Sequence, residues 1–433
     1  MAQCNIGLIG AGTVGGGVAK ILHKQEFFFS SELGLTIKLK RIVDKQTSRF
    51  ETLPVGDAIC TDNADDIISD PDIHVVVELI GGTTIAKELV LKALSAKKHV
   101  VTANKALIAE HGPEIFEVAE KNGVSIYFEA SVGGGMPTIK TIRESMVAND
   151  ILSLKTIING TCNYILTEME VNRLTFDDAL HLAQKNGFAE ADPTLDIGGG
   201  DTGHKVAIMA SLLYGGYVPY ESLPIEGITS ITADDIEYAD ELGYRIKLLG
   251  VIKSSGPGKP LDVRVHPAML KKDHILASVS SEFNAVLLEG DAVGPILLYG
   301  KGAGELPTAS AVVGDIVDVA RNITGNTPVR IPMDFYVQSN QKKLRSTADV
   351  VLRYYLRFTV PDRPKILSQI ASVLGDHGIS IASLVQPESS GDDVPVVMLT
   401  HAARERNLQK AIAEIEEMPD VVRDKTQIIR IED

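Results

Sequence analysis

The stretch GFAEADPTLDIGGGDTGHK, residues 187–205, carries side chains that could hold a small substrate and move a proton. Three glycines form a turn, Asp201 then stands at the expected start of a helix, and Lys205 follows one turn later on the same face. The positive end of the helix dipole and burial would both favour loss of the Lys205 proton, whereas Asp201 would oppose it. Such a lysine suits proton transfer. An ordinary helix cap with an ion pair has the same spacing, and spacing alone favours that alternative.

The segment GAGTVG predicts a dinucleotide-binding turn. Gly10, Gly12 and Gly15 come directly after the apolar strand CNIGLI and directly before the amphipathic run VAKILHK. Glycines at these positions allow a tight turn, close approach of a pyrophosphate to the backbone, and packing of the helix on the strand. A GxGxxG alone is a weak signal, but its place between a strand and a helix makes the prediction specific.

Asp44 ends the second expected strand, KRIVD, where a carboxylate contacts the ribose of such a cofactor. It lies farther along the chain than usual because EFFFSSELG lengthens the connection. A carboxylate there accepts the 2′-hydroxyl of NAD and repels the 2′-phosphate of NADP. Lys45 and Arg49 are close enough in sequence to offset that repulsion, so the sequence favours NAD and leaves NADP open.

Three further segments could contribute to a site. Lys105, in VVTANK, follows a strand end, where ligands collect in open α/β sheets, although a solvated loop lysine fits the position equally well. EASVGGGMPTIK bends the backbone after a strand and could turn main-chain groups towards a ligand. Cys162, in the polar turn INGTCNYI, could be a nucleophile, but without a nearby histidine base a small core cysteine is the commoner case.

The elements that must position these residues alternate between strand and helix over residues 1–130. CNIGLIG, TIKLKRIVD, HVVVELIGG, HVVTAN and SIYFEA are typical of short buried strands, and TIAKELVLKALSAKK and GPEIFEVAEKNG are typical of helices. This alternation predicts an α/β fold with a Rossmann-type parallel sheet and helices on both of its faces.

The rest of the chain divides into three more parts. Residues 131–300 mix helical segments, among them DDIEYADELGYRIKLLG, with alternating strands, which predicts an α+β catalytic and dimerisation domain. Residues 301–340 contain a further helix and return to pack on the dinucleotide domain, and residues 338–349 are typical of a linker. Residues 350–433 show the order β-α-β-β-α-β of a ferredoxin-like fold, with Asp362 and Pro364 at the start of its first helix and Gly378 at its end.

Composition excludes several classes of partner. The 433 residues carry a formal net charge of −15, and no basic stripe offsets it, which argues against nucleic acid and anionic membranes. No apolar run approaches the length of a membrane span, and the first residues lack a charged signal region. Three scattered cysteines give neither a disulfide framework nor a zinc site. These features predict a cytoplasmic protein.

Six segments, in this order and spacing, resemble those of homoserine dehydrogenases over residues 3–330. They are GAGTVG, VVTANKAL, FEASVGGGMP, INGTCNYIL, GFAEADPTLDIGGGDTGHK and GAGELPTA. Residues 350–433 resemble an ACT domain. The resemblance implies reversible NAD(P)-dependent interconversion of L-aspartate 4-semialdehyde and L-homoserine, in the route to threonine, methionine and isoleucine. It also implies a homodimer or homotetramer.

Matched by position, the resemblance assigns roles to particular residues. Lys205 would be the proton donor to the substrate carbonyl oxygen, with Lys105 assisting and Asp201 beside it. Substrate-binding residues would be Glu190, Asp201, Gly160 and Thr161. Cofactor contacts would be Gly10, Gly12, Thr13, Val14, Gly15, Asp44, Thr83, Lys105, Gly187, Glu190 and Gly304. A monovalent cation, Na⁺ or K⁺, would be held by the main-chain carbonyls of Glu129, Val132, Gly134 and Met136.

Two positions depart from common patterns of the family. Phe188 stands where many members have tyrosine, which puts a hydroxyl contact near the substrate in doubt. Val43 stands where members that prefer NADP often carry arginine, which supports the expectation of NAD.

The ACT resemblance implies a small amino-acid effector, and we expect feedback inhibition by L-threonine through Gly378, Ile379 and Gln386. A dimerisation module without a ligand is the alternative for this part of the chain. Two other functions stay open from sequence. One is an aldehyde-oxidising dehydrogenase with Cys162 as nucleophile, and the other is a sensor of nucleotides and amino acids without turnover.

Overall fold

The computed structural model describes residues 3–256, 258–327, 329–330, 333, 336–386 and 392–432. The chain forms two compact units. The first unit contains Met1–Leu152, His204–Leu223 and Asn284–Lys342, and the second contains Ser153–Gly203, Pro224–Phe283 and Lys343–Asp433. Each unit is therefore assembled from segments far apart in sequence.

The first unit is built on a parallel sheet with the strand order β3-β2-β1-β4-β5-β6. Its strands are β1 (Gln3–Ile9), β2 (Thr36–Val43), β3 (Ile59–Thr61), β4 (Val75–Glu78), β5 (His99–Thr102) and β6 (Ile126–Tyr127). This order is that of a dinucleotide-binding Rossmann sheet, with its switch point between β1 and β4. The predicted fold of this part is confirmed.

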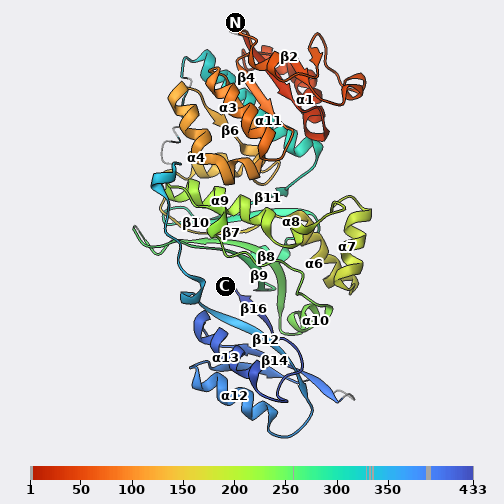
Figure 1. Cartoon of the computed structure of the whole chain (residues 1–433), viewed down its shortest axis with the longest axis vertical. Coiled ribbons are helices and arrows are strands. Elements are labelled where there is room, and N and C mark those ends of the chain that lie inside the picture. Colours follow the sequence, from red (N-terminus) through yellow and green to blue (C-terminus); the bar gives the residue numbers. More distant parts are fainter. Residues whose placement is uncertain are drawn as a thin grey trace. The chain divides into compact units, whose positions relative to one another are not determined.

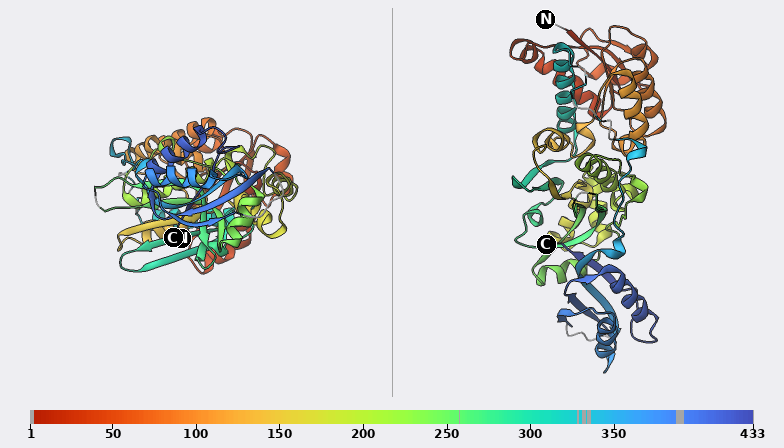
Figure 2. Two further views of the ribbon diagram at one scale, coloured as in Figure 1. Left: turned by 90° about the horizontal axis from the view of Figure 1, so that it is seen from below. Right: turned by 90° about the vertical axis from the view of Figure 1, so that its left-hand side faces the viewer.

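Two pairs of helices flank the sheet. Helices α1 (Thr13–Ser31) and α11 (Glu305–Thr324) pack on each other, as do α3 (Thr84–Ser95) and α4 (Lys105–Asn122) (Figure 1). Figure 2 shows α11, in teal, beside the red α1 in its right-hand view. Ala309, Val312 and Ile316 of α11 share one buried core with Val18 of α1 and with strand β1. The segment after residue 300 thus completes the core of the dinucleotide-binding part.

The remaining elements of the first unit are shorter. They are η1 (Thr47–Thr52), α2 (Asp65–Ile68), η2 (Glu129–Ser131), α5 (Thr138–Lys140), a π-helical turn (Thr141–Ser145), η4 (Tyr220–Ser222), the neighbouring strands β10 (Phe283–Gly290) and β11 (Gly294–Lys301), and η6 (Gln338–Asn340).

The second unit contains a mixed sheet with the order β7-β8-β9-β16-β12-β14-β13. Strands β7 (Ile151–Ile157), β8 (Tyr244–Lys253) and β9 (Asp262–Lys271) are antiparallel to their neighbours in this group. Helices α6 (Gly160–Asn172), α7 (Phe176–Lys185), α8 (Thr194–Ile197), α10 (Ala233–Glu241) and the short η5 (Ile275–Ser278) accompany them, and α9 (Gly200–Tyr214) begins in this unit.

The C-terminal part of this unit has the predicted ferredoxin-like order. It runs through β12 (Val351–Pro361), α12 (Ile366–Asp376), β13 (Ile381–Val385), β14 (Asp393–Thr400), the short β15 (Ala403–Arg404), α13 (Glu405–Glu417) and β16 (Gln427–Ile431), after η7 (Thr347–Asp349). Strand β16 pairs with β12 on one side and with β9 on the other. The ACT sheet therefore continues directly into the sheet of the catalytic part.

Three predicted boundaries are wrong. Helix α4 begins at Lys105 and not near Gly112, because Asn104 caps its first turn and Pro113 is accommodated inside the helix. The run expected as one helix from Asp234 to Gly250 breaks after Glu241, and Tyr244–Lys253 is strand β8.

The third wrong boundary is the start of the first ACT helix. Helix α12 begins at Ile366, beyond Asp362 and Pro364, because Lys365 has φ 80° and a left-handed residue ends the preceding turn. Among the described residues, no helix is long and apolar enough to cross a membrane.

Candidate functional site

The glycine loop between β1 and α1 is packed too closely for larger residues. Gly10 has φ 102°, a conformation that favours glycine. A Cβ atom added to Gly15 would lie 1.9 Å from the Gly10 carbonyl oxygen, so α1 can start against this turn only if residue 15 has no side chain. The turn presents the amino end of a 19-residue helix, which is an anion-binding arrangement.

Asp44 follows β2 and faces this turn. Its carboxylate accepts the Ala11 N–H at 2.7 Å and the Gln46 N–H at 2.7 Å, and it pairs with the Arg49 guanidinium at 2.9 Å. Burial by itself would raise the pKa of Asp44, but these hydrogen bonds and the Arg49 charge outweigh it and lower the pKa. The carboxylate is therefore ionised and held in place beside the glycines.

A cavity of about 610 Å³ lies along this edge of the sheet. Its walls include Gly10, Gly12, Asp44, Arg49 and Gly81. Its volume is in the range of small-molecule sites, and glycine backbone beside the Asp44 carboxylate and the Arg49 guanidinium fits a dinucleotide. The other charged residues of the lining are Lys45, Asp62, Asp65, Glu88 and Lys92. Thr13 and Val14 open α1, Thr83 precedes α3, and Gly304 precedes α11 with φ 118°.

A buried carboxylate organises the loops after β4 and β5. Glu78 is fully buried and accepts the Ile80 N–H at 2.9 Å and the Thr102 hydroxyl at 2.6 Å. The Asn104 side chain accepts the Leu107 N–H at 3.1 Å and donates to the Gly82 carbonyl at 2.6 Å. These bonds fix the TAN turn against the loop after β4, and so fix where α4 begins.

Lys105 and Lys205 belong to the first unit and stand on two helices that are joined directly. Lys105 is the first residue of α4, and Lys205 lies in α9. His204 Nε2 lies 3.0 Å from Glu110 Oε1 of α4, and the His204 ring stacks on Tyr220 with centroids 4.0 Å apart. Both lysines are half-buried. Lys105 does follow a strand end, as predicted, but the alternative of a solvated loop lysine is wrong, since Lys105 is the first residue of a helix.

In the second unit the structure gathers carboxylates around Asn159. The Asn159 amide nitrogen donates to Asp201 at 2.7 Å and to Asp196 at 2.7 Å, and its oxygen accepts the Cys162 N–H at 2.7 Å as the cap of α6. Asp201 is 4 % exposed and is the second residue of α9, as the spacing predicted. Asn159 thus ties the start of α6 to the acidic stretch.

The other predicted substrate residues lie in the same unit. The Thr161 hydroxyl donates to the Phe188 carbonyl at 2.6 Å. Gly160 lies against the backbone of Glu282, where a Cβ would come within 2.8 Å of the carbonyl oxygen, so packing alone already requires glycine there. Glu190 and Gly187 are exposed, and Gly187 has φ 77°.

Sequence reasoning missed four residues of this arrangement. Asn159 and Asp196 lay within segments quoted above. Nothing in the sequence set the amide of Asn159 apart from other polar side chains, or Asp196 apart from the other acids of its segment. His204 also lay within a quoted segment, but its partner Glu110 is 94 positions away in sequence, and only the folded structure brings the two side chains together.

Cys162 has the surroundings of a core cysteine. It is fully buried, and its thiol donates to the Asp196 carbonyl at 3.2 Å. The segment expected as a polar turn is the first turn of α6. A covalent nucleophile must reach its substrate, so this burial does not favour the aldehyde-oxidising alternative.

The segment predicted to hold a cation is a tightly bent part of the first unit. Gly133 and Gly134 have φ 80° and 56°, and a Cβ on Gly134 would lie 2.4 Å from the Gly302 carbonyl oxygen. The Glu129 and Met136 carbonyls each accept one backbone N–H, from Val132 and Thr138, which leaves a second lone pair on each oxygen. Such oxygens suit an alkali cation.

The Glu129 side chain holds the same bend. Its carboxylate accepts the N–H groups of Ile139 and Lys140, both at 2.8 Å. Burial raises its pKa to about 7 in spite of these hydrogen bonds. The Glu129 N–H in turn donates to Asp315 of α11 at 2.9 Å.

The predicted effector residues stand at one end of the ACT part. Gly378 has φ 73° after α12, Ile379 is 3 % exposed and belongs to the ACT core, and Gln386 is exposed just after β13. The Ile379 side chain is thus occupied by packing, which leaves its backbone and the neighbouring groups to contact a ligand.

Comparison with known proteins places these features in one family. Family models match residues 10–129 (homoserine dehydrogenase, NAD binding domain), 137–317 (homoserine dehydrogenase) and 354–420 (ACT domain). A homoserine dehydrogenase of Neisseria gonorrhoeae is 44 % identical over 100 % of this chain and 99 % of its own length. One from Pseudomonas aeruginosa is 43 % identical over 97 % of each.

Solved structures agree with these matches. The homoserine dehydrogenase of Thiobacillus denitrificans superposes with a TM-score of 0.93, at 43 % identity over 100 % of this chain and 99 % of that one. A hyperthermophilic archaeal homoserine dehydrogenase mutant in complex with NADPH has a TM-score of 0.63 at 25 % identity, over 76 % of this chain and all of its own. The chain belongs to the homoserine dehydrogenase family and carries a C-terminal ACT domain.

Proposed function

We propose that the protein interconverts L-aspartate 4-semialdehyde and L-homoserine with a nicotinamide dinucleotide, in the route to threonine, methionine and isoleucine. The observation that carries this is the placement of Lys105 and Lys205 on helices joined by His204 and Glu110. Lys105 follows the carboxyl end of β5, in the sheet that carries the glycine loop. Ligands of open α/β sheets bind beyond such strand ends.

Lys205 gives a proton to the aldehyde oxygen as that oxygen becomes an alkoxide, and takes it back in the reverse direction. The cofactor, when bound, supplies or accepts the hydride. An ammonium aimed at the oxygen stabilises the developing negative charge before it transfers the proton. Lys105 stabilises the same oxygen, and its place in the first turn of α4 fixes its distance from the end of β5.

Asp201, Glu190, Gly160 and Thr161 bind the substrate. The amino acid has an ammonium group, which a carboxylate neutralises, and Asp201 also orients the hydroxyl end. Asn159 supports this role because its side-chain amide donates to the Asp201 carboxylate at 2.7 Å and so fixes its position.

The cofactor is held by Gly10, Gly12, Thr13, Val14, Gly15, Asp44, Thr83, Lys105, Gly187, Glu190 and Gly304. The pairing of Asp44 with Arg49 bears on the choice between NAD and NADP. Asp44 favours the free ribose of NAD, whereas Arg49 could rotate to a 2′-phosphate, and 40 % of its side chain is exposed. We propose a preference for NAD that is modest because Arg49 is present.

Two further assignments rest on family resemblance and on the local backbone. Main-chain carbonyls of Glu129, Val132, Gly134 and Met136 bind Na⁺ or K⁺ and hold the bend that follows β6. L-Threonine binds the ACT domain near Gly378, Ile379 and Gln386 and inhibits the enzyme. The chain acts as a homodimer or homotetramer.

The central test is the substitution Lys205→Met. We expect turnover of L-homoserine to fall by about 10²- to 10⁴-fold, the range for loss of a general acid, while the dissociation constant of the reduced cofactor stays within twofold. Steady-state rates and fluorescence titration with NADH and NADPH measure the two quantities.

The matched control is Lys24→Met, an exposed lysine of α1, which should leave both quantities unchanged. Near-normal turnover of the Lys205 variant would refute the assignment. Assays of the parent with each cofactor, with and without threonine, also test the cofactor preference.

A further inference from the structure

A second cavity lies at the amino ends of strands β4 and β5, the opposite sheet edge from the glycine loop. Its volume is about 480 Å³. The polar side chains that line it are His74, Lys97, Lys98, His99 and Asn326, and the rest of the wall is largely apolar, with Pro71, Ile73, Ala96 and Ile323. All of these residues belong to the first unit. Nothing in the proposed reaction uses them.

Two imidazole rings in this cavity are fixed as hydrogen-bond donors. His74 Nδ1 accepts the Asn5 N–H at 3.0 Å, and His99 Nδ1 accepts the Ser125 N–H at 3.1 Å. Because each Nδ1 is an acceptor, the ring proton must lie on Nε2. Burial lowers the pKa of His99 to about 4, and nearby His74 adds to this effect, so the donor form persists at neutral pH.

This tautomer rules out a metal ion as the occupant. A ring that accepts at Nδ1 and carries its proton on Nε2 has no lone pair left for coordination. The two Nε2–H groups instead fit an oxygen acceptor.

Lys98 adds a buried positive charge that lacks a bonded carboxylate. Lys98 is only 5 % exposed. Its Nζ donates to the backbone carbonyls of Asp70 at 2.6 Å and Ile73 at 2.8 Å. Burial lowers the pKa of Lys98, although the charge of Asp70 opposes this. The Asp70 carboxylate is already bound by Lys40 at 2.9 Å and Arg41 at 2.8 Å.

An ammonium has three N–H groups, so Lys98 retains one donor beyond its two carbonyl bonds. Buried charges are ordinarily paired, and in the part of the chain that the structure describes no carboxylate forms an ion pair with Lys98. An anion in the adjoining cavity would provide that pairing. Lys97, which is exposed at the same place, adds a second positive charge.

We propose that this cavity binds a small organic oxyanion, a carboxylate or phosphate carried on a short apolar body. Its oxygens accept from Nε2 of His74 and His99 and from the Lys98 ammonium, and its body lies against Pro71, Ile73 and Ile323. The volume of the cavity is that of a small-molecule site. It is not a second dinucleotide site of the usual kind, because none of the residues that line it is a glycine.

The test uses the full-length protein with two probes, succinate and inorganic phosphate, each titrated by calorimetry at constant ionic strength. We expect saturable binding of at least one probe, and the comparison of the two tells a carboxylate site from a phosphate site. In protein labelled with ¹⁵N-histidine, the Nε2–H signals of His74 and His99 should shift with the same dissociation constant, and those of exposed His23 and His181 should not.

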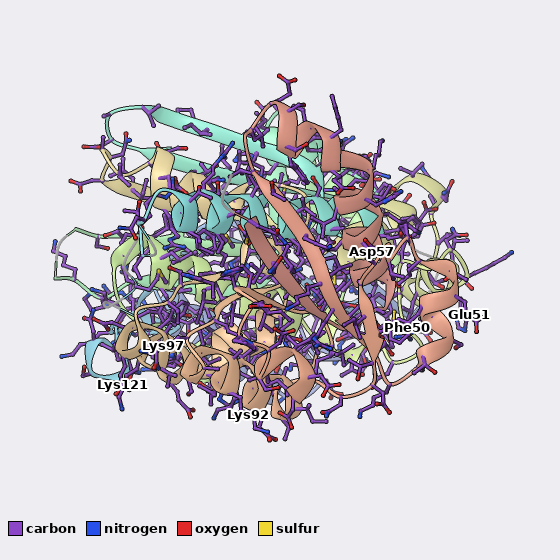
Figure 3. All side chains as sticks on the ribbon, turned by 90° about the horizontal axis from the view of Figure 1, so that it is seen from above. Phe50, Glu51, Asp57, Lys92, Lys97 and Lys121 are labelled. Carbon is purple, nitrogen blue, oxygen red and sulfur yellow. The ribbon has the colours of Figure 1, made fainter. Side chains whose placement is uncertain are left out.

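Three lysine variants locate the site. Lys98→Met should abolish the binding, and Lys97→Met should weaken it by about three- to tenfold, the effect of losing a partly screened charge. Lys121→Met is the matched control for lost charge, since Lys121 is also an exposed lysine of this unit; Figure 3 labels both Lys97 and Lys121. Turnover of L-homoserine should be unchanged in Lys97→Met.

The Lys97 variant and the histidine signals keep the test decisive if Lys98→Met fails to fold. No saturable binding of either probe, binding that Lys97→Met leaves unchanged, or equal shifts at His23 and His181 would each overturn the proposal. Because turnover is measured separately, failure here is distinguishable from failure of the proposed reaction.

Discussion

At the residue scale, the buried Lys247 illustrates how the surroundings of a lysine set its pKa and its effect on stability. Lys247 of β8 is 1 % exposed, and its ammonium has the Asn163 side-chain oxygen at 3.3 Å. Burial lowers its pKa to about 8, and the charge of Arg245 adds to this while that of Glu170 opposes it. The folded protein therefore binds this proton less tightly than the unfolded chain does.

We expect Lys247→Met to raise the free energy of unfolding at pH 7, by on the order of a few kcal/mol, because it removes a charge that burial disfavours. The folded-state pKa is the lower one, so the parent loses this disadvantage as the pH rises from about 8 towards 10.5. The difference between variant and parent should shrink over that window in urea denaturation. A difference that does not vary with pH would contradict this account.

At the scale of single elements, helices α1 and α11 each contain a glycine, but only the glycine of α1 is required by close packing. Gly15 has no room for a Cβ atom, whereas Gly314, inside α11, has nothing within 4 Å of that position. Gly15→Ala should force the glycine loop apart, destabilise the fold by about 1–3 kcal/mol and weaken cofactor binding at least tenfold. Thermal unfolding and NADH titration would measure both effects.

Gly314→Ala is the matched control for that substitution. Alanine is favoured over glycine inside a helix by about 1 kcal/mol, so this variant should be more stable than the parent and bind the cofactor equally well. Equal behaviour of the two variants would show that the close approach at Gly15 does not matter for binding.

Element boundaries explain most of the differences between prediction and structure. Strand β3 was not predicted because its three residues are largely exposed and show no apolar alternation. The helix predicted from Gly112 begins instead at Lys105, because Asn104 caps its first turn, and Pro113 lies inside it. Strand β3 thus gave no local signal, whereas the starts of α4 and α12 depend on the cap at Asn104 and on the left-handed backbone of Lys365.

At the scale of the whole molecule, the ACT domain shares a sheet with the catalytic part of its unit. Arg264 of β9 pairs with Glu432, directly after β16, and with Asp262, and all three are nearly inaccessible. Burial alone would raise the pKa of Glu432, but Arg264 and Lys253 lower it to about 2. Deletion of residues 346–433 would remove β16 and leave Arg264 without Glu432, so truncation is a poor test of regulation.

Glu432→Gln should lower the free energy of unfolding by about 3–5 kcal/mol at pH 7, because one partner of a buried pair is lost. The folded pKa of Glu432 is depressed, so its contribution is present above its unfolded pKa of about 4.5 and is lost as the pH falls towards 2. The gap between parent and variant should close over that range. A gap that persists at pH 2 would contradict the pairing.

Threonine regulation is better tested by a point substitution that leaves this sheet intact. Gln386→Ala should raise the threonine concentration for half-inhibition by about tenfold without changing the uninhibited rate, because one hydrogen-bonding contact is lost. Gln369→Ala, in the exposed face of α12, is the control. Inhibition unchanged in Gln386→Ala would place the effector contact at other residues.

The sequence by itself determined the strand–helix alternation of residues 1–130, the β-α-β-β-α-β order of residues 350–433, the glycine loop and the family. These features depend on local periodicity, on turn residues and on motifs of fixed spacing. Only the tertiary structure decided which distant groups meet, such as His204 with Glu110, Asn159 with Asp196 and Asp201, and Arg264 with Glu432. A side chain's type shows which bonds it can form, but its partner depends on packing between segments that the chain separates.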